Sequence, residues 1–558
     1  MVSSSYTVTR GVGVPMRDGV VLASDVWLPA HASPVAAVLF RTPYDRSAYT
    51  TDVLRPQHCV EAGLAAVMQD MRGRFGSGGD WRPFDWQTEA EDGYDTVEWI
   101  AAQQWSSGAV GMSGLSYCGT AQLAASRLKP PHLKAIAPAM ASDPASDRVE
   151  AGGALRLDLV MSWLGVTSLD WLLRRPAVDP QVAGLILAAV QDPRLLYGIR
   201  PLRGIPLFEL EDFPLTFDEV YARLNTPTEY TGVDPDIPTM HVGGWFDFSH
   251  STSVDLFRGQ TTAGNQASHL VMGPWTHSSQ LPQVQGQLNF GAMAAAGASR
   301  LPERLLDFFR RHLRDESKDL PRVTYFLMNS GGWRTDEQWP PAATATRVLY
   351  LGHDGGSGIL ADTPPLGDAA PDQFTYDPDD PTPTVGGRNL TFGRLTAGPV
   401  SQEALGGRAD VLRYRGAPVE DPLDIVGTVT ATLFASTSAA DTDFVVKLLD
   451  EDPHGVAVAV CTGAIRLRFR GGFDAEQPYS PGEVTRLVVP LGHTAWRVLP
   501  GHRLALQVQS ADFPHLDPNP NTGEPLGRAQ GVVPAVNRVF RDRERASAIE
   551  LGILGATS

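Results

Sequence analysis

A serine stands between glycines in the stretch GMSGLSYCG. A hydroxyl is a poor nucleophile unless a neighbouring base removes its proton, so Ser116 is a candidate nucleophile if the fold supplies that base. The stretch lies between two predicted helices, 88–104 and 120–128, which puts Ser116 at a sharp turn from a strand into a helix. Cys118 occupies the place of the second glycine of the usual motif, and Gly119 follows one residue later. Taken alone, this pattern fits an ordinary turn as well as an active site.

The base and the acid that orients it are sought at strand ends, because the carboxyl edge of a parallel sheet is where its ligands bind. Asp247 directly follows a buried-looking strand in HVGGWFDFS, and His277 directly follows the next one in VMGPWTHSS. The chain order Ser, Asp, His is the order found in sheets of this kind. The sequence therefore predicts a triad of Ser116 as nucleophile, His277 as general base and Asp247 as its orienting acid. Taken singly, Asp247 also fits a capping residue, and His277 a loop histidine bonded to the backbone.

An oxyanion develops when a serine attacks a carbonyl carbon, and each preorganised donor stabilises it by about 3 kcal/mol. The backbone N–H of Tyr117, directly after the nucleophile, is one candidate donor. Tyr44 is the second candidate, because it follows the first strong strand in VLFRTPYDRS and its neutral phenol can donate a hydrogen bond. A tyrosine packed on the surface beside Pro43 explains the same residues equally well.

These side chains can meet only if particular elements carry them. Over residues 35–138, short apolar runs alternate with helix-like segments, which predicts a parallel sheet covered on both faces. Residues 143–235 have helical spacing and no obvious strands, so we expect a helical insertion. The strand pattern resumes at 237–245 and 268–275, and residues 302–313 predict an amphipathic helix. The sheet domain is therefore expected to be split in two by an inserted cap.

The C-terminal part has a different pattern. From about residue 345, alternating runs such as DIVGTVTATLFAST and RLALQVQS are punctuated by glycine, proline and aspartate. This pattern is typical of an antiparallel β-sandwich of the jelly-roll kind. Residues 352–385, rich in glycine, aspartate and proline, are predicted to be loop or linker.

Composition sets the class of protein. A chain of 558 residues is long enough for two to four domains, and its 63 acidic and 46 basic residues give a net charge of −17. Such a charge repels nucleic acid and anionic lipid. The N-terminus has no signal-like apolar region, and the apolar stretches fall short of the roughly 20 residues that cross a bilayer, so we expect a cytoplasmic protein without nucleic-acid or membrane partners. Three cysteines have neither disulfide-framework nor metal-ligand spacing, and we expect free thiols and no metal: Cys59, Cys118 and Cys461.

A set of stretches along the chain is also familiar: PMRDGV, RTPYDRS, VMQDMRGRFGSGGDW, GMSGLSYCG, APAMAS, GGWFDFS, MGPWTHSS and LPGHRLALQVQSADFP. In this order, from about residue 6 to 550, they resemble the bacterial cocaine esterase family of serine hydrolases, which includes X-prolyl dipeptidyl peptidases and α-amino-acid ester hydrolases. The resemblance implies an α/β fold in three parts. It places an α/β-hydrolase domain at 1–142 and 236–345, a helical cap insertion at 143–235 and a jelly-roll β-sandwich domain at 346–558.

The resemblance also implies roles for matching positions. It implies a catalytic triad of Ser116, Asp247 and His277. It also implies an oxyanion hole formed by the Tyr44 hydroxyl and the Tyr117 N–H. Trp163 lies where the family has an aromatic wall for the acyl group, although plain packing of a cap helix explains the same residue. A homodimer through helices or through the jelly-roll edge is a further expectation.

We therefore predict an enzyme that cleaves small-molecule carboxylic esters through an acyl-enzyme intermediate. An acyltransferase stays open as an alternative, because its first half-reaction is identical. A binding module with an inert hydrolase part is a further alternative, and the complete triad argues against it. The glycine-rich stretch RGRFGSGG lacks P-loop and dinucleotide spacing, and the acidic loops lack EF-hand spacing, so we expect no cofactor.

X-prolyl dipeptidyl peptidase and α-amino-acid ester hydrolase activities are a third alternative. Family members that act on α-amino-acid esters hold the substrate ammonium partly with two acids shortly after the triad aspartate. Residues 248–250 here are Phe, Ser and His, which argues against such recognition, although Asp143 and Asp147 leave it open. X-prolyl peptidases of the family also carry an extra N-terminal region that we do not expect here.

Overall fold

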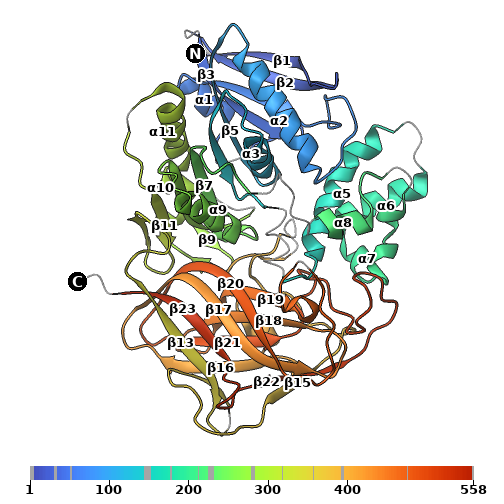
Figure 1. Ribbon diagram of the computed structural model, residues 1–558, viewed down its shortest axis with the longest axis vertical. Helices are drawn as coiled ribbons and strands as arrows, with labels where there is room; N and C mark the ends of the chain where they lie inside the picture. Colours follow the sequence, from blue (N-terminus) through green and yellow to red (C-terminus); the bar gives the residue numbers. More distant parts are fainter. Residues whose placement is uncertain are drawn as a thin grey trace.

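A computed structural model of the chain gives the fold (Figure 1). The structure describes residues 6–30, 34–50, 53–143, 152–175, 179–210, 213–223, 232–277, 283–316, 318–355, 357–390, 395–473 and 475–555. Figure 1 shows three parts: a sheet with helices on both faces, a group of helices beside it, and an all-β part that lies against both. The two termini lie on different parts of the molecule.

A sheet of ten strands forms the first part. The strands are β1 (Tyr6–Pro15), β2 (Val21–Pro29), β3 (Val35–Thr42), β4 (Ala65–Asp70), β5 (Ser106–Leu115), β6 (Leu133–Ala139), β7 (Thr239–Phe246), β8 (Ser268–Thr276), β11 (Val323–Leu327) and β12 (Gly332–Asp336). Their spatial order is β1-β2-β4-β3-β5-β6-β7-β8-β11-β12, with parallel pairs from β4 through to β11 and antiparallel pairs at both edges. Every residue of β3 and β7 is buried, as a parallel sheet covered on both faces requires.

Helices cover both faces of this sheet. Leu305, Phe308 and Phe309 of the amphipathic helix pack in the apolar cluster on one face, together with residues of β3, β4 and β6. Leu123 and Val97 belong to the cluster on the opposite face. The helices of this part are α1 (Pro56–Glu61), α2 (Trp86–Ala101), α3 (Tyr117–Arg127), α9 (His250–Thr262), α10 (Ala296–Ser299) and α11 (Leu301–Arg314), with the short 3₁₀ helix η3 (Ala292–Ala294).

The second part lies in the chain between β6 and β7 and is helical. In the described residues from 152 to 223 the elements are helices and no strand occurs. They are α5 (Leu157–Leu173), α6 (Pro180–Gln191), α7 (Arg194–Tyr197) and α8 (Phe217–Arg223), with 3₁₀ helices η1 (Leu202–Gly204) and η2 (Pro206–Glu209). Figure 1 shows this cap beside α2 and α3, on the right of the view.

The third part is all-β, with an eleven-stranded sheet. It contains β13 (Thr344–His353), β14 (Gly358–Ala361), β15 (Asp372–Tyr376), β16 (Leu412–Pro418), β17 (Leu423–Thr437), β18 (Asp443–Glu451), β19 (Ala457–Arg466), β20 (Thr485–Val498), β21 (Arg503–Gln509), β22 (Ala535–Phe540) and β23 (Ala548–Leu554). One large apolar cluster joins this sheet to the first part, since it includes both Phe246 at the end of β7 and Trp496 of β20. The end of β7 is therefore held by the all-β part.

Two details of the sequence analysis are wrong for this part. The segment 352–385 was expected to be loop, whereas it contains β14 and β15. Strands of four and five residues carry too few alternating positions for the pattern to distinguish them from loops. The sheet is also not wholly antiparallel, because β14 pairs with β16 in parallel.

Two further findings concern the cysteines and the length of the helices. The three cysteines are free and buried: Cys59, Cys118 and Cys461. Over the ranges that the structure describes, no helix combines the length and the apolar character needed to cross a membrane.

Candidate active site

Ser116 occupies the turn between β5 and α3. Its backbone has φ 61° and ψ −126°, a strained conformation for a residue with a side chain, and its N–H donates to the carbonyl of Ala139 at 2.9 Å. Helix α3 begins at Tyr117, three residues before the predicted start, and Ser116 is the residue that precedes its first turn. The hydroxyl is therefore presented above the carboxyl edge of the sheet.

Two glycines make this tight turn sterically accessible. A Cβ atom on Gly114 would lie 2.6 Å from the Cβ of Cys118, and one on Gly119 would lie 2.8 Å from the Cβ of Ala141. Both distances are too short for carbon atoms, so only glycine fits at either position. The second glycine of the motif stands at position 119 here in place of 118. It still permits the close packing of α3 against the end of β6.

The three predicted triad side chains lie together. The Nε2 atom of His277 is 2.9 Å from the Oγ atom of Ser116, and its Nδ1 atom is 2.6 Å from Oδ2 of Asp247. The other oxygen of Asp247 accepts hydrogen bonds from the N–H and the hydroxyl of Ser249, at 2.7 and 2.5 Å. A buried carboxylate that accepts from Nδ1–H leaves Nε2 as a proton acceptor toward Ser116.

Tyr44 and the first turn of α3 lie on the other side of the serine. The indole Nε1–H of Trp163 donates to the hydroxyl oxygen of Tyr44 at 2.8 Å. Burial raises the pKa of the Tyr44 phenol well above its usual value, and the Ser116 hydroxyl is a further hydrogen-bonding neighbour. The N–H of Tyr117 is in the first helical turn, where no intrahelical acceptor is available. A neutral phenol and a main-chain N–H therefore flank the serine oxygen.

An aromatic pocket opens beside the serine. The Tyr117 ring stacks on Trp163 with centroids 5.5 Å apart and contacts Trp86 at 4.9 Å. Trp163 lies in the wall of this pocket and also contacts Tyr44. Sequence reasoning missed most of the other walls, because no spacing pattern marks them. The lining residues are Phe84, Trp86, Ser116, Tyr117, Thr120, Ser142, Leu159, Val160, Trp163 and Phe248.

Of the two acids considered for amine recognition, Asp143 is not among the described residues that line the aromatic pocket. Asp143 is buried, and one of its carboxylate oxygens accepts from the N–H of Gly232. Asp147 lies outside the described residues. Phe248 is the residue after Asp247 that reaches the site, with its ring centroid 4.6 Å from that of His277. Among the described residues that line the aromatic pocket none is acidic.

Comparisons with known proteins extend over the whole chain. The model of the X-Pro dipeptidyl-peptidase (S15 family) matches residues 18–279, and that of the X-Pro dipeptidyl-peptidase C-terminal non-catalytic domain matches residues 316–550. Cocaine esterase of Rhodococcus sp. (strain MB1 Bresler) is 35% identical, over 99% of this chain and 100% of that protein. The chain belongs to the S15 family. It is an enzyme, a serine hydrolase.

Solved structures of the S15 family's relatives agree with this membership. An aminopeptidase from a marine sediment Thaumarchaeota archaeon superposes with a TM-score of 0.79 at 26% identity, covering 99% of this chain and 97% of that one. An α-amino acid ester hydrolase superposes with a TM-score of 0.74 at 27% identity, with the same coverage. The predicted fold class, an α/β-hydrolase domain with an inserted cap and a C-terminal all-β domain, is confirmed.

Proposed function

We propose that this serine hydrolase cleaves carboxylic esters of small molecules through an acyl-enzyme intermediate on Ser116. The observation that carries the proposal is the pair of hydrogen bonds that links Asp247 to His277 and His277 to Ser116. The relative named cocaine esterase, similar over its full length, supports an ester as the substrate class.

The first half-reaction forms the acyl-enzyme. His277 Nε2 takes the proton of the Ser116 hydroxyl as its oxygen attacks the ester carbonyl carbon. Asp247 keeps the imidazole in the right tautomer and stabilises the imidazolium that forms. The Tyr44 hydroxyl and the Tyr117 N–H donate to the oxyanion, and the alcohol leaves with the proton that His277 returns.

The second half-reaction releases the acid. His277 takes a proton from water, the hydroxide attacks the acyl carbon, and the Ser116 oxygen leaves as it regains a proton from His277. The aromatic walls beside the serine favour an apolar acyl group there, because burying such a group against rings removes apolar surface from water.

Two alternatives use the same chemistry up to the acyl-enzyme. An acyltransferase would give the acyl group to a bound alcohol or amine in place of water. An X-prolyl peptidase or an α-amino-acid ester hydrolase would have to hold a free ammonium. Such recognition is disfavoured by the absence of acidic side chains among those lining residues of the pocket that the structure describes.

A substrate panel separates these activities. We expect rapid release of nitrophenol from p-nitrophenyl butyrate and at least 100-fold slower cleavage of Gly-Pro-p-nitroanilide, about 2.7 kcal/mol in activation free energy. Repeating the assay with an added acceptor alcohol distinguishes transfer, since a transferase would yield mainly the new ester. Faster cleavage of the dipeptide anilide than of the ester would favour the peptidase.

Variants test the roles of the residues. Ser116→Ala should abolish labelling by a fluorophosphonate probe, and His277→Ala and Asp247→Asn should lower kcat by about 10⁴ or more while remaining folded. Ser113→Ala is the matched control, because this buried hydroxyl lies on β5, the strand that leads to Ser116, and has no hydrogen-bond partner in the described structure. Wild-type esterase rates in Ser116→Ala would refute the proposal.

A further inference from the structure

The glycine-rich stretch RGRFGSGG, residues 72–79, lies in the connection between β4 and α2. Strand β3 pairs in parallel with both β4 and β5, so this loop, the Tyr44 turn and Ser116 all leave the sheet at the same edge. At the start of the loop, the N–H of Met71 donates to the carbonyl of Thr42 at 3.0 Å. The loop is therefore a direct neighbour of the turn that carries Tyr44.

Two glycines let this loop fold tightly. Gly73 has φ +66°, and a Cβ atom there would lie 2.1 Å from the main-chain nitrogen of Trp81. A Cβ atom on Gly76 would lie 2.6 Å from Nη1 of Arg46. Both distances are too short for a side chain, so the glycines serve the compact path of the chain on either side of Arg74.

Arg74 bridges two parts of the molecule from within this loop. Its side chain is buried, and its Nε–H donates to the carbonyl of Pro43 at 2.9 Å. A second donor, Nη1–H, bonds the carbonyl of Thr167 in α5 at 2.8 Å. Pro43 immediately precedes Tyr44, so one guanidinium holds both the Tyr44 turn and a helix of the cap.

The Arg74 side chain keeps its charge in this buried place. Burial lowers the pKa of the guanidinium to about 10, and the carboxylate of Asp170, 3.5 Å from Nη1, acts in the opposite direction. The side chain is therefore cationic at neutral pH. Hydrogen bonds from a charged donor are about twice as strong as those between neutral groups, which suits a side chain that holds two main-chain segments.

Helix α5 also carries Trp163, one turn before Thr167. The Thr167 hydroxyl donates to the carbonyl of Trp163 at 2.8 Å. A second contact runs through Trp81, whose ring lies 4.4 Å from the Arg74 guanidinium and 5.7 Å, between centroids, from the ring of Trp163. Arg74 thus supports Trp163 both through the main chain of α5 and through an aromatic side chain.

The hydrogen bond from the Trp163 indole to the Tyr44 hydroxyl, 2.8 Å long, joins the cap to the hydrolase domain. Its length depends on how the two parts are held beside each other. Other ties connect the loop to α5, among them the bond from the N–H of Phe75 to Asp170 at 3.1 Å. Arg74 differs from these ties because it also bonds the turn on which Tyr44 stands.

We propose that Arg74 is a positioning residue for the oxyanion hole, because it fixes the Tyr44 turn relative to the cap helix that carries Trp163. The inference rests on the proposed function, which gives Tyr44 its role as a donor to the oxyanion. A displacement of about 1 Å at such a donor lowers a rate by as much as about 10²-fold. Arginine suits the task, since its planar guanidinium presents several N–H donors in a fixed geometry.

A double-variant cycle separates positioning from a general loss of structure. Arg74→Met removes the donors, and kcat for p-nitrophenyl butyrate should fall at least tenfold while KM changes less than threefold. In the Tyr44→Phe background the same substitution should change kcat less than twofold, because no hydroxyl is left to be misplaced. An equal fall in both backgrounds would overturn the inference.

Arg72→Met is the matched control, because Arg72 stands in the same loop. Its guanidinium bonds Asp92 at 2.6 Å and Asp18 at 2.6 Å, and neither carboxylate belongs to the Tyr44 turn or to the cap. We expect kcat within twofold of the wild type. A fall as large as that of Arg74→Met would show that any damage to the loop slows the enzyme, and it would overturn the role of Arg74.

Arg74→Lys keeps the test available if Arg74→Met does not fold. The ammonium group retains the charge and lacks the fork that bonds two carbonyls at once. We expect kcat to fall at least threefold, again only where the Tyr44 hydroxyl is present. A wild-type kcat in Arg74→Lys would overturn the bridge between the two carbonyls.

A crystal structure of the more stable variant gives a readout that needs no activity. The distance between Nε1 of Trp163 and the hydroxyl oxygen of Tyr44 should rise from 2.8 Å to above about 3.5 Å. An unchanged distance would overturn the inference whatever the substrate is. A wild-type rate in Tyr44→Phe would refute the oxyanion role of Tyr44 together with this inference, whereas a wild-type rate in Arg74→Met beside a slow Tyr44→Phe would refute this inference alone.

Discussion

The hydroxyl of Tyr44 is oriented by a side chain that also forms a pocket wall. An indole N–H donates and never accepts, so the bond from Trp163 at 2.8 Å occupies the oxygen of Tyr44 and leaves its proton free to point toward the reacting carbonyl. A phenol whose oxygen accepts a hydrogen bond also becomes a better donor in the hydrogen bond that its own O–H makes. At the residue scale, Trp163 therefore acts as a positioning residue for the proposed oxyanion hole as well as a wall.

Trp163→Phe keeps an aromatic wall and removes the N–H. We expect kcat for p-nitrophenyl butyrate to fall about tenfold with a smaller change in KM, because the lost contact acts on the transition state. Tyr44→Phe should lower kcat by about 10² or more. In the double variant the two effects should not multiply, since Trp163 acts through Tyr44.

The control for lost volume is Trp86→Phe. Trp86 lines the same pocket, and its indole nitrogen has no hydrogen-bond partner in the described structure. Its replacement should change KM more than kcat. A fully multiplicative double variant of Trp163 and Tyr44 would contradict the positioning role.

At the scale of elements, the position of Ser116, the proposed nucleophile, depends on how closely α3 approaches the ends of β5 and β6. The absence of side chains at Gly114 and Gly119 permits this approach, and the turn at Ser116 follows from it. The two glycines of the motif are therefore required for the close packing of α3 against these strand ends.

Gly119→Ala tests this requirement. The new Cβ would lie 2.8 Å from that of Ala141, and we expect a loss of about 1–3 kcal/mol in the free energy of unfolding with a fall in kcat as Ser116 shifts. Gly184→Ala in α6 is the matched control, because it is exposed, meets no atom within 4 Å and should stabilise by about 0.5–1 kcal/mol. Denaturant unfolding of both variants measures the difference, and an unchanged Gly119→Ala enzyme would contradict this account.

Helix α2 carries a buried carboxyl against the sheet. Glu89 lies 3.0 Å from the guanidinium of Arg41, yet burial raises its pKa to about 7. The folded state therefore binds more protons than the unfolded state between the usual pKa of about 4.5 and 7, so the free energy of unfolding should fall as pH rises through this window.

Glu89→Gln removes this titration. Urea unfolding at pH 5, 6, 7 and 8 should show a flatter pH dependence in Glu89→Gln than in the wild type, whereas Glu91→Gln on a partly exposed position of the same helix should keep the wild-type slope. A slope that is equal in all three proteins would show that Glu89 does not titrate in this range.

At the scale of the whole molecule, buried charges join the all-β part to the cap. Arg466 donates to both oxygens of Asp443 at 2.9 Å and to Asp517 at 3.1 Å. Asp517 in turn accepts from the N–H of Leu155, just before α5. The aromatic pocket depends on this connection, because residues of α5 form part of its walls.

Arg466→Ala leaves two carboxylates buried without this guanidinium. We expect a loss of about 3–5 kcal/mol in the free energy of unfolding, measured by thermal or denaturant unfolding. Arg347→Ala is the control, because its ion pair with Asp362 at 2.8 Å is largely exposed, and its loss should cost less than about 1 kcal/mol. Equal stability of the two variants would contradict a linking role for Arg466.

The predicted homodimer and cytoplasmic localisation also belong to this scale, and both stay predictions. Sedimentation of the purified enzyme checks the first, and fractionation of cells checks the second.

The sequence by itself determined which strands are followed by the residues of the proposed triad. A parallel sheet brings the carboxyl ends of its strands to one edge, so Ser116, Asp247 and His277 could be placed near one another from local patterns alone. The helical cap and the all-β part likewise followed from periodicity and turn residues. These features need only short-range information along the chain.

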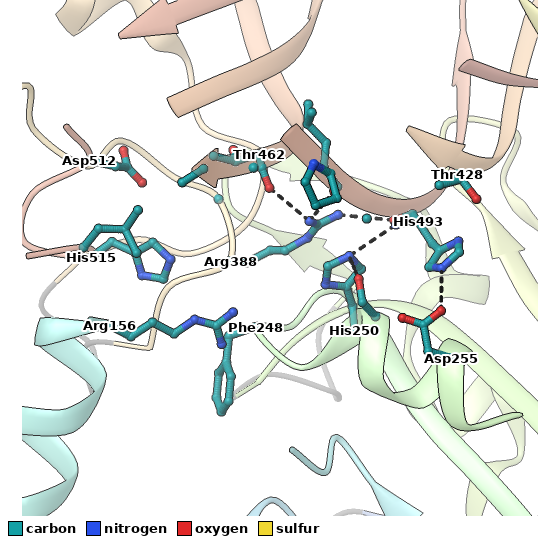
Figure 2. A pocket seen from close by; sticks show the side chains of 18 of the residues that line it. Arg156, Phe248, His250, Asp255, Arg388, Thr428, Thr462, His493, Asp512 and His515 are labelled. Carbon is teal, nitrogen blue, oxygen red and sulfur yellow. Dashed lines mark hydrogen bonds and ion pairs between the residues drawn. The ribbon is translucent and has the colours of Figure 1, made fainter. Parts of the chain in front are cut away.

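Only the tertiary structure decided which residues form the walls of the aromatic pocket. Phe84 and Trp86 come from one segment and Phe248 from another far along the chain, and no spacing rule says which faces meet. A second cavity, where the three parts of the molecule meet (Figure 2), depends even more on the tertiary structure. Among its lining residues, Arg156 precedes a cap helix, His250 starts a helix of the hydrolase domain, and Gly492 lies in a strand of the all-β part. Periodicity shows that a face is apolar, whereas its partner is set by packing among all three parts.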